Sequence, residues 1–448
     1  MQADNANFTG GGHTFGNNST VNNTNIYGGA HALENLKEFV SFAALHDSAE
    51  QDPDRCCHPG TRKSVLSQLR HWIDNPNPTD RIFWLHGPAG AGKSAIAQTI
   101  AREYNKGGVA ATFFFYRSDP GRNDGNRLFT TIAWQLAFSI PAVKDFIIAA
   151  LEKTPHLPMK AMETQFEELV AHPTNNIASQ MPQLAPVVII DGVDECANEQ
   201  LQRRFLSVIG NAVKDPHCPL RFLIISRPEA LIEETLHQFK DFTLRIDLAT
   251  LDDANRDIEK YLVDQFSDIA SKRGLDPLWP GQETINEIVL KSSGNFILPS
   301  TLMRFIGDED HNPESQLDIV RKLKPPGTMS PFAFLDELYL EILKRQPDQE
   351  FLKTFLALII GRSSIKQDVF YNGVFRNSVF HGSALHGSTF HNSTFHSNVF
   401  HGSGLHGSMF DNSTFDNSAF DNNALHGSRF NNNSEFQRSM FHDRGIAR

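Results

Sequence analysis

An apolar residue recurs at every fifth position through the C-terminal part of the chain. A helix would distribute residues of this period around its surface, and a straight strand would alternate them between its two faces. Neither element can bury them together, so the chain must turn at every step. The positions are Ile365, Phe370, Phe375, Phe380, Leu385, Phe390, Phe395, Phe400, Leu405, Phe410, Phe415, Phe420, Leu425 and Phe430.

A second period of twenty residues lies on top of the first. Ile365, Leu385, Leu405 and Leu425 are the aliphatic members of the series, and phenylalanine fills the positions between them. Serine often stands two residues before the apolar position, and Asn or Gly often stands two residues after it, where turns are favoured. Four sides of five residues therefore complete one square coil.

This pattern resembles the pentapeptide-repeat family, whose right-handed quadrilateral β-helix buries the central apolar residue of each step. The resemblance implies a β-helix over residues 361–442, followed by a tail at 443–448. We expect the last coil to be distorted, because Glu435 falls on an inward position and Phe436 and Phe441 are one residue out of frame. A disordered Asn/Ser/Gly tract is the alternative, but low complexity alone gives no reason to keep an apolar frame.

Histidines often follow the apolar positions, and in the square coil they face solvent. His386, His406 and His426 would stack in one column, separated by about 4.8 Å, the spacing of neighbouring strands. Such a column could bind a metal ion or respond to pH, since imidazole titrates near neutrality. A solvated face without either role is the alternative, and we favour it.

Length, charge and cysteine content bound the class of protein. The 448 residues correspond to about two to four domains. The formal net charge of −11 and the absence of a basic run disfavour nucleic acid as a partner. No signal peptide or membrane-length apolar run is visible, so we expect a cytoplasmic protein. The cysteines lack metal-ligand spacing and are expected to be reduced thiols.

Turn signals and periodicity divide the rest of the chain. Residues 1–30 are Gly/Asn-rich and are expected to be flexible, and residues 31–80 form a helical lead-in. Residues 81–248 alternate strands with helices, which predicts an α/β domain with a parallel sheet and helices on both faces. Residues 249–360 have helical periods. The expected strands are Arg81–Leu85, Val109–Tyr116, Val187–Ile190 and Arg221–Ile225, and the main expected helices are Arg62–Trp72, Lys93–Tyr104 and Phe129–Ala149.

A glycine-rich loop follows the first of these strands. The segment from Gly87 to Ser94 fits G-x-x-x-x-G-K-S between a strand and a helix, which is the context of a P-loop. Backbone N–H groups of such a loop point at phosphate oxygens, aided by the positive end of the helix. Lys93 would neutralise the β- and γ-phosphates, and Ser94 would bind Mg²⁺. The predicted nucleotide-contacting residues of the loop are Gly87, Pro88, Ala89, Gly90, Ala91, Gly92, Lys93, Ser94 and Ala95.

Charged residues follow two later strands. In VVIIDGVDEC, Asp191 is placed to hold Mg²⁺ at the carboxyl edge of the sheet. Asp194 and Glu195 follow within reach of an attacking water, and one of them would polarise it. In RFLIISRPE, Arg227 would contact the γ-phosphate through two N–H groups. The alternatives are a solvated acidic loop and a surface ion pair.

Together these segments resemble the NACHT-domain signal-transduction ATPases of mushroom-forming fungi. The resemblance covers residues 40–345 and is carried by CCHPGTR, HGPAGAGKSAIAQTIA, FFFYRSD, VVIIDGVDEC and PLRFLIISRPE. It implies binding of ATP or GTP with Mg²⁺, slow hydrolysis, and a nucleotide switch between a closed and an assembling state. It also implies nucleotide contacts for two further arginines, Arg62 and Arg117.

The chain departs from that family at its C-terminal side. We expect the winged-helix domain to be truncated, since TFLALIIGRSS leads directly into the repeat. The predicted β-helix replaces the usual ankyrin, WD40 or TPR array. We therefore expect an NTPase switch with protein partners and self-association through the repeat. A nucleotide-binding or degenerate scaffold without turnover is the alternative.

Overall fold

The computed structural model describes residues 24–323 except 53, 77, 179–184 and 252, then residues 333–345, and shorter pieces elsewhere. The chain divides into two compact units, one reaching Lys322 and the other running from Ala333 onward. No helix in the described ranges is long and apolar enough to cross a membrane. The shorter pieces are residues 14–15, 19–20, 352–353 and 356 and the strands between 369 and 441 given below.

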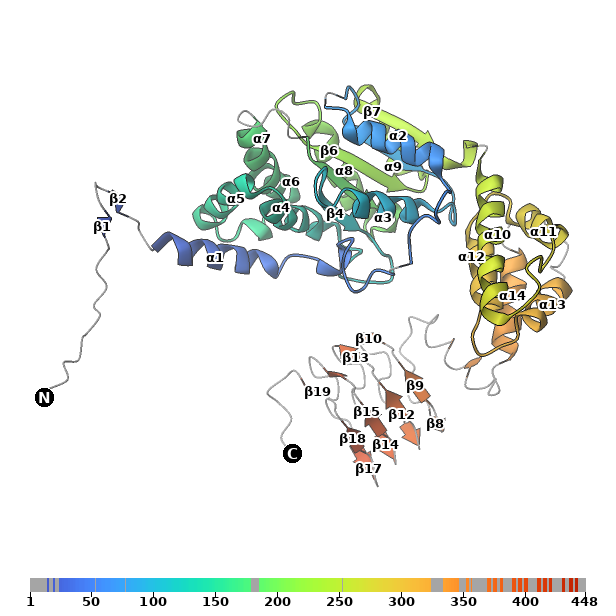
Figure 1. Ribbon diagram of the computed structural model, residues 1–448. Helices are drawn as coiled ribbons and strands as arrows, with labels where there is room; N and C mark the ends of the chain where they lie inside the picture. Colours follow the sequence, from blue (N-terminus) through green and yellow to red (C-terminus); the bar gives the residue numbers. More distant parts are fainter. Residues whose placement is uncertain are drawn as a thin grey trace, which may run out of the picture. The chain divides into compact units, whose positions relative to one another are not determined.

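A five-stranded parallel sheet organises the first unit, with the order β4-β5-β6-β3-β7 (Figure 1). The four apolar strands β4, β5, β6 and β3 are completely buried, which confirms the parallel α/β sheet predicted from their continuous apolar runs. The edge strand β7 is partly exposed and was not predicted, because its sequence TLRID lacks such a run. The strands are β3 Ile82–His86, β4 Val109–Phe114, β5 Val187–Asp191, β6 Arg221–Ser226 and β7 Thr243–Asp247.

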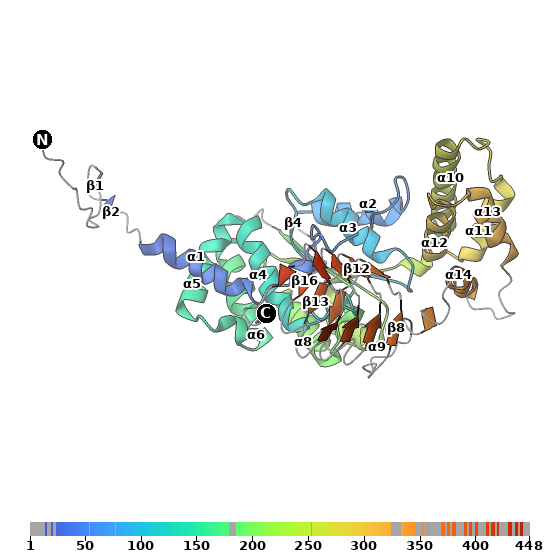
Figure 2. The ribbon, with the colours of Figure 1, turned by 90° about the horizontal axis from the view of Figure 1, so that it is seen from below.

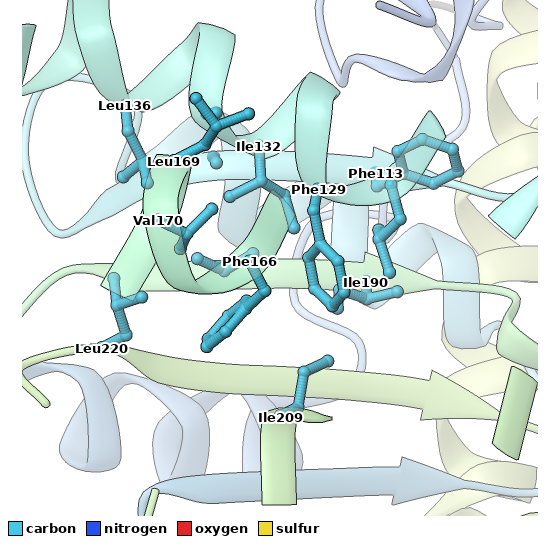
Figure 3. Close-up of a cluster of buried hydrophobic side chains, with 14 of the residues drawn as sticks. Phe113, Phe129, Ile132, Leu136, Phe166, Leu169, Val170, Ile190, Ile209 and Leu220 are labelled. Carbon is cyan, nitrogen blue, oxygen red and sulfur yellow. The ribbon is translucent and has the colours of Figure 1, made fainter. Parts of the chain in front are cut away.

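Helices cover both faces of this sheet, and alternate strand residues face each layer. Phe83 and Leu85 of β3 pack against α2 (Lys63–Asp74) and α3 (Lys93–Glu103). Trp84 belongs to the opposite layer. That layer contains α4 Leu128–Ser139, α8 Glu199–Ala212 and α9 Ala230–His237, and Figure 3 shows part of its core, including Phe113, Phe129, Ile132, Phe166 and Ile190.

Two predicted boundaries in this unit were wrong. The single helix expected over Phe129–Ala149 is broken after Ser139, and α5 (Pro141–Lys153) begins with a proline, which has no N–H to continue the helix. Helix α1 (Thr24–Lys37) begins before residue 31, inside the stretch expected to be flexible. The other elements between α1 and β5 are η1 Phe42–Ala44, η2 Gly125–Arg127, η3 Leu157–Met159, α6 Met162–Phe166, a π-helical turn Glu167–Ala171 and α7 His172–Ala178.

Helices follow β7, as the sequence predicts. Four of them, α10 to α13, belong to the first unit, and α14 belongs to the second. Figure 2 shows the long α10 beside α11 and α12. The helices are α10 Ala254–Arg273, α11 Gln282–Ser292, α12 Ile297–Ile306, α13 Pro313–Lys322 and α14 Ala333–Lys344.

Short parallel strands stack into three ladders in the second unit, in the orders β8-β11-β14-β17, β9-β12-β15-β18 and β10-β13-β16-β19. Phe370 pairs with Phe390 and Phe375 with Phe395, an offset of twenty residues. This is the register that the sequence predicts for three sides of a square coil. The strands are β8 Val369–Tyr371, β9 Val374–Arg376, β10 Val379–His381, β11 Thr389–His391, β12 Thr394–His396, β13 Val399–His401, β14 Met409–Asp411, β15 Thr414–Asp416, β16 Ala419–Phe420, β17 Arg429–Asn431, β18 Glu435–Gln437 and β19 Met440–Phe441.

The fourth side of the square coil, with Leu385, Leu405 and Leu425, lies outside the described residues. The four-sided closure and its right hand therefore stay predictions. The histidine column of His386, His406 and His426 also lies outside them.

The last coil keeps its phenylalanines in register, contrary to the expectation for Glu435. Phe415, which is fully buried, pairs with Phe436, and Phe420 pairs with Phe441. Both offsets are twenty-one residues, and Glu435 pairs with Thr414 beside the phenylalanine column instead of entering it. One extra residue is therefore accommodated before β18.

Candidate functional site

The predicted phosphate-binding loop joins β3 to α3. Gly90 and Gly92 have φ values of 77° and 82°, in the left-handed region that glycine adopts without strain. Helix α3 begins at Lys93, so the N–H groups of its first turn have no partner within the helix. The loop and this helix end together form a concentration of backbone donors suited to an anion.

Lys93 lies over the loop. Its ammonium group donates hydrogen bonds to the carbonyl oxygens of Gly87 and Pro88, each at 2.8 Å. Burial lowers the pKa of Lys93, and the nearby carboxylates of Asp194 and Asp191 oppose that shift. The side-chain nitrogen thus lies between the loop carbonyls and the acidic end of β5.

The two predicted metal ligands, Ser94 and Asp191, come together. Asp191 ends β5, is 3% exposed, and accepts a hydrogen bond from the Ser94 side chain. Its Oδ1 atom is buried and has no hydrogen-bond partner among the residues that the structure describes. A hydroxyl and a buried carboxylate oxygen with free lone pairs are hard oxygen ligands of the kind that Mg²⁺ prefers. The pair therefore fits a Mg²⁺ ion.

Protonation of Asp191 should compete with the metal. Burial raises the pKa of this carboxyl to about 6. We expect Mg²⁺-dependent nucleotide affinity to fall as the pH is lowered through this value, because the protonated acid cannot bind the cation. A binding titration across about pH 5 to 8, with and without Mg²⁺, measures this. A metal-dependent component that stays constant across the range would contradict the assignment of Asp191 as the ligand.

The acidic residues after Asp191 have different partners. Asp194 is 4% exposed; its Oδ1 accepts a hydrogen bond from the backbone N–H of Arg227 at 2.9 Å, and its Oδ2 lies 3.2 Å from Arg227 Nε. Glu195 Oε2 accepts a hydrogen bond from the Arg117 backbone N–H at 3.0 Å. The ends of β4, β5 and β6 are thus tied together where the sheet meets the loop.

Arg117 contacts the acidic loop through its side chain as well. Its guanidinium donates to the Asp194 carbonyl at 2.8 Å. Arg117 thus lies against the residues that follow β5, and within the described residues it makes no hydrogen bond to the phosphate-binding loop. Its predicted contact with nucleotide stays a prediction.

Arg62 contacts the phosphate-binding loop directly. It is 3% exposed and has a φ of 55°, and its guanidinium donates to the Ala91 carbonyl at 2.8 Å. The same group lies over the ring of Phe296 at 4.9 Å, and the Arg62 backbone N–H donates to Asp257 at 2.8 Å. Arg62 therefore joins the loop to the helical segment.

The helical segment also contacts the loop at Gly90, which sequence reasoning missed. The backbone N–H of Phe296 donates to the Gly90 carbonyl at 2.9 Å. A Cβ atom on Gly90 would meet Ile297 Cγ2 at 2.8 Å, so the close approach requires glycine there. The stretch SGNFILPS, which contains Phe296 and Ile297, is the only sequence signal of this contact.

His86, the last residue of β3, was not predicted as a site residue. It is 1% exposed, and Arg245 Nε donates to its Nε2 at 2.7 Å. Because arginine can only donate, the proton of the neutral imidazole is on Nδ1. Burial lowers the pKa of His86, which favours that neutral form. Arg245 lies on β7, the strand that periodicity did not reveal.

The strand order, the loop between β3 and α3, and the Ser94–Asp191 pair define the class as a nucleotide-binding P-loop NTPase-like fold. The sequence profile of the family described as Nephrocystin 3, N-terminal matches residues 60–227, which span the loop and the strand ends. No curated protein matches the chain.

A solved structure of the Aeropyrum pernix ORC1 protein in complex with DNA is similar at 14% identity and a TM-score of 0.34. The similarity covers 69% of this chain and 75% of that chain. Similarity at this level has no bearing on what this chain binds.

Proposed function

We propose that the chain binds ATP or GTP together with Mg²⁺, hydrolyses it slowly and acts as a NACHT-type switch in signalling or assembly. The observation that supports this most is that Oδ1 of Asp191, beside Ser94 and near Lys93, has no hydrogen-bond partner among the described residues. Bound Mg²⁺ would neutralise and orient the phosphates. The resemblance to fungal NACHT ATPases adds a role in immune or self/non-self signalling in the cytoplasm.

The residues take separate roles in this proposal. The loop and Lys93 bind the phosphates, and Ser94 and Asp191 hold the metal. Arg227 contacts the γ-phosphate, and Glu195, which is only half-buried, accepts the proton of the attacking water. Arg62 joins the loop to the helical segment through Ala91 and Phe296, so that a change at the loop reaches that segment.

Single-turnover hydrolysis tests the proposal. Excess protein is mixed with γ-labelled ATP or GTP and Mg²⁺, and phosphate release is followed over hours. We expect one phosphate per bound nucleotide and no release after chelation of the metal. Bound nucleotide that stays intact would instead favour the scaffold without turnover, and the absence of any binding would contradict the nucleotide function.

The repeat favours a second function, assembly through protein contacts. Each of its three ladders ends in strands that have one neighbour in the ladder. An outermost strand whose N–H and C=O groups are unpaired can template the addition of another chain. We propose that self-association and protein partners act through this part of the chain.

Deletion of residues 363–448 should abolish self-association and leave nucleotide binding intact, because the loop and its acidic partners all lie before that boundary. Light scattering gives the mass of the full chain and of the truncated chain, and a nucleotide titration of both is the control. An unchanged mass per particle, after allowance for the deleted residues, would exclude the repeat as the assembly surface.

A further inference from the structure

Three acidic residues lie within five positions at the end of β5, and the structure gives each a different set of partners. Asp191 has a partnerless oxygen beside Ser94. Asp194 accepts a hydrogen bond from the Arg227 backbone N–H through one oxygen and forms an ion pair with Arg227 Nε through the other. Glu195 accepts a hydrogen bond from the Arg117 backbone N–H through one oxygen. Sequence reasoning left open which of the last two polarises water, and these partners distinguish them.

We infer that Asp194 is a positioning residue that holds Arg227 toward the γ-phosphate, and that Glu195 is the base. This inference rests on the proposed NTPase function. A base must direct a free lone pair at water. Asp194 is only 4% exposed. Its Oδ1 already accepts a hydrogen bond from the Arg227 backbone N–H, and its Oδ2 lies against Arg227 Nε.

The same contacts leave the other end of Arg227 available. Asp194 engages the backbone N–H and Nε, whereas the two terminal amino groups of Arg227 make no hydrogen bond to any residue that the structure describes. The side chain is 48% exposed. These two amino groups are the pair that binds a phosphate in a bidentate manner. Asp194 therefore does not compete with a phosphate for Arg227 but fixes the direction in which Arg227 presents its donors.

The backbone around Asp194 is held in place from the neighbouring strand and helix. The Arg117 guanidinium donates to the Asp194 carbonyl at 2.8 Å. Gln202 of α8 donates to the preceding carbonyl, that of Val193, at 2.7 Å. The Asp194 carboxylate therefore has little freedom to turn toward a water. Preorganisation of this kind removes the entropic cost of ordering the arginine when the phosphate binds.

The experiment is a double-mutant cycle on triphosphate selectivity. Affinities for a non-hydrolysable triphosphate and for the diphosphate are measured for the unchanged chain, Asp194→Asn, Arg227→Gln and the double variant. We expect each single change to lower the ratio of triphosphate to diphosphate affinity about tenfold or more, and the double change to lower it no further. Glu195→Gln should keep the ratio and lose turnover.

The outcomes separate this inference from the function on which it rests. An unchanged chain that binds neither nucleotide would overturn both. A ratio that depends on Arg227 but not on Asp194, or effects that add in the double variant, would overturn the positioning role alone. Loss of turnover in Asp194→Asn with the ratio intact would identify Asp194 as the base.

A second variant covers the case in which a change at the buried Asp194 prevents folding. Arg227→Lys changes a half-exposed side chain, so it should fold. One ammonium group cannot bond Asp194 and also bind the phosphate in a bidentate manner. The ratio of triphosphate to diphosphate affinity should therefore fall as far as it does in Arg227→Gln. If the variant kept this ratio, the guanidinium group that Asp194 holds would not be needed for triphosphate selectivity.

Discussion

Lys93→Ala is expected to remove nucleotide binding, with affinity for ATP or GTP lowered about a hundredfold or more, since a charge-assisted contact to two phosphates is lost. The unchanged protein should carry stoichiometric nucleotide after purification, and the variant none. Nucleotide content is measured by denaturing the protein and separating the released nucleotide by chromatography. The ratio of diphosphate to triphosphate also shows in which state the chain rests.

Lys106→Ala is the matched control for this change. Lys106 lies beyond the end of α3 and is exposed, so its loss removes the same charge from the molecule without touching the loop. It should purify with as much nucleotide as the unchanged protein. If Lys93→Ala also purified with as much nucleotide, the loop would not be the nucleotide site. If the unchanged protein contained no nucleotide, the result would point to the repeat as the functional part.

Asp191→Asn should have two opposite effects, of which the first is functional. Mg²⁺-dependent hydrolysis should fall about a thousandfold, because an amide oxygen lacks the charge that holds the metal. Ser94→Ala, which removes the other proposed ligand, should lower hydrolysis in the same direction. Retained turnover in Asp191→Asn would overturn the metal assignment.

The second effect of Asp191→Asn is a gain in stability. The pKa of this carboxyl is raised from 3.8 to about 6 by burial, so its ionisation destabilises the folded state. The folded state therefore has its full stability below about pH 4 and loses the contribution of this carboxyl as the pH rises through about 6. Asparagine cannot ionise, and the variant should have a free energy of unfolding on the order of 2 kcal/mol higher at pH 7, with no difference near pH 4.

Urea unfolding in the absence of Mg²⁺ and nucleotide measures this gain. Asp247→Asn is the control, because Asp247 also ends a strand of the sheet but its side chain is 35% exposed. A variant at Asp191 that is less stable than the unchanged protein at pH 7 would show that the ionised carboxylate is compensated by contacts beyond Ser94.

The four buried strands and the first helices could be predicted because their signals are local. Continuous apolar runs mark β3, β4, β5 and β6, since each is buried on both faces. The edge strand β7 alternates poorly and is half-exposed, so no run marks it. The break before Pro141 could have been predicted from proline chemistry, but the apolar residues on either side of it continue the helical period.

The site residues fall into the same two groups: some are marked by local sequence patterns, and others depend on contacts between segments far apart in the sequence. The spacing of the loop places Lys93 and Ser94 on one helix end, and a strand that ends in an acid supplies Asp191. The pairing of Asp194 with Arg227 joins residues 33 positions apart and depends on β5 and β6 being neighbours. The contact of Phe296 with Gly90 depends on how the helical segment packs, for which the sequence holds no periodic signal.

The ladders of the second unit have a consequence for changes in chain length. Pairing between successive coils advances by twenty residues in most of the repeat and by twenty-one at its end, yet phenylalanine meets phenylalanine in both cases. The aromatic residue, and not the count of residues, thus sets the alignment at each side. One extra residue before β18 leaves the pairing of both β18 and β19 intact, so a ladder can accept a single-residue insertion between its strands and keep its phenylalanine pairing.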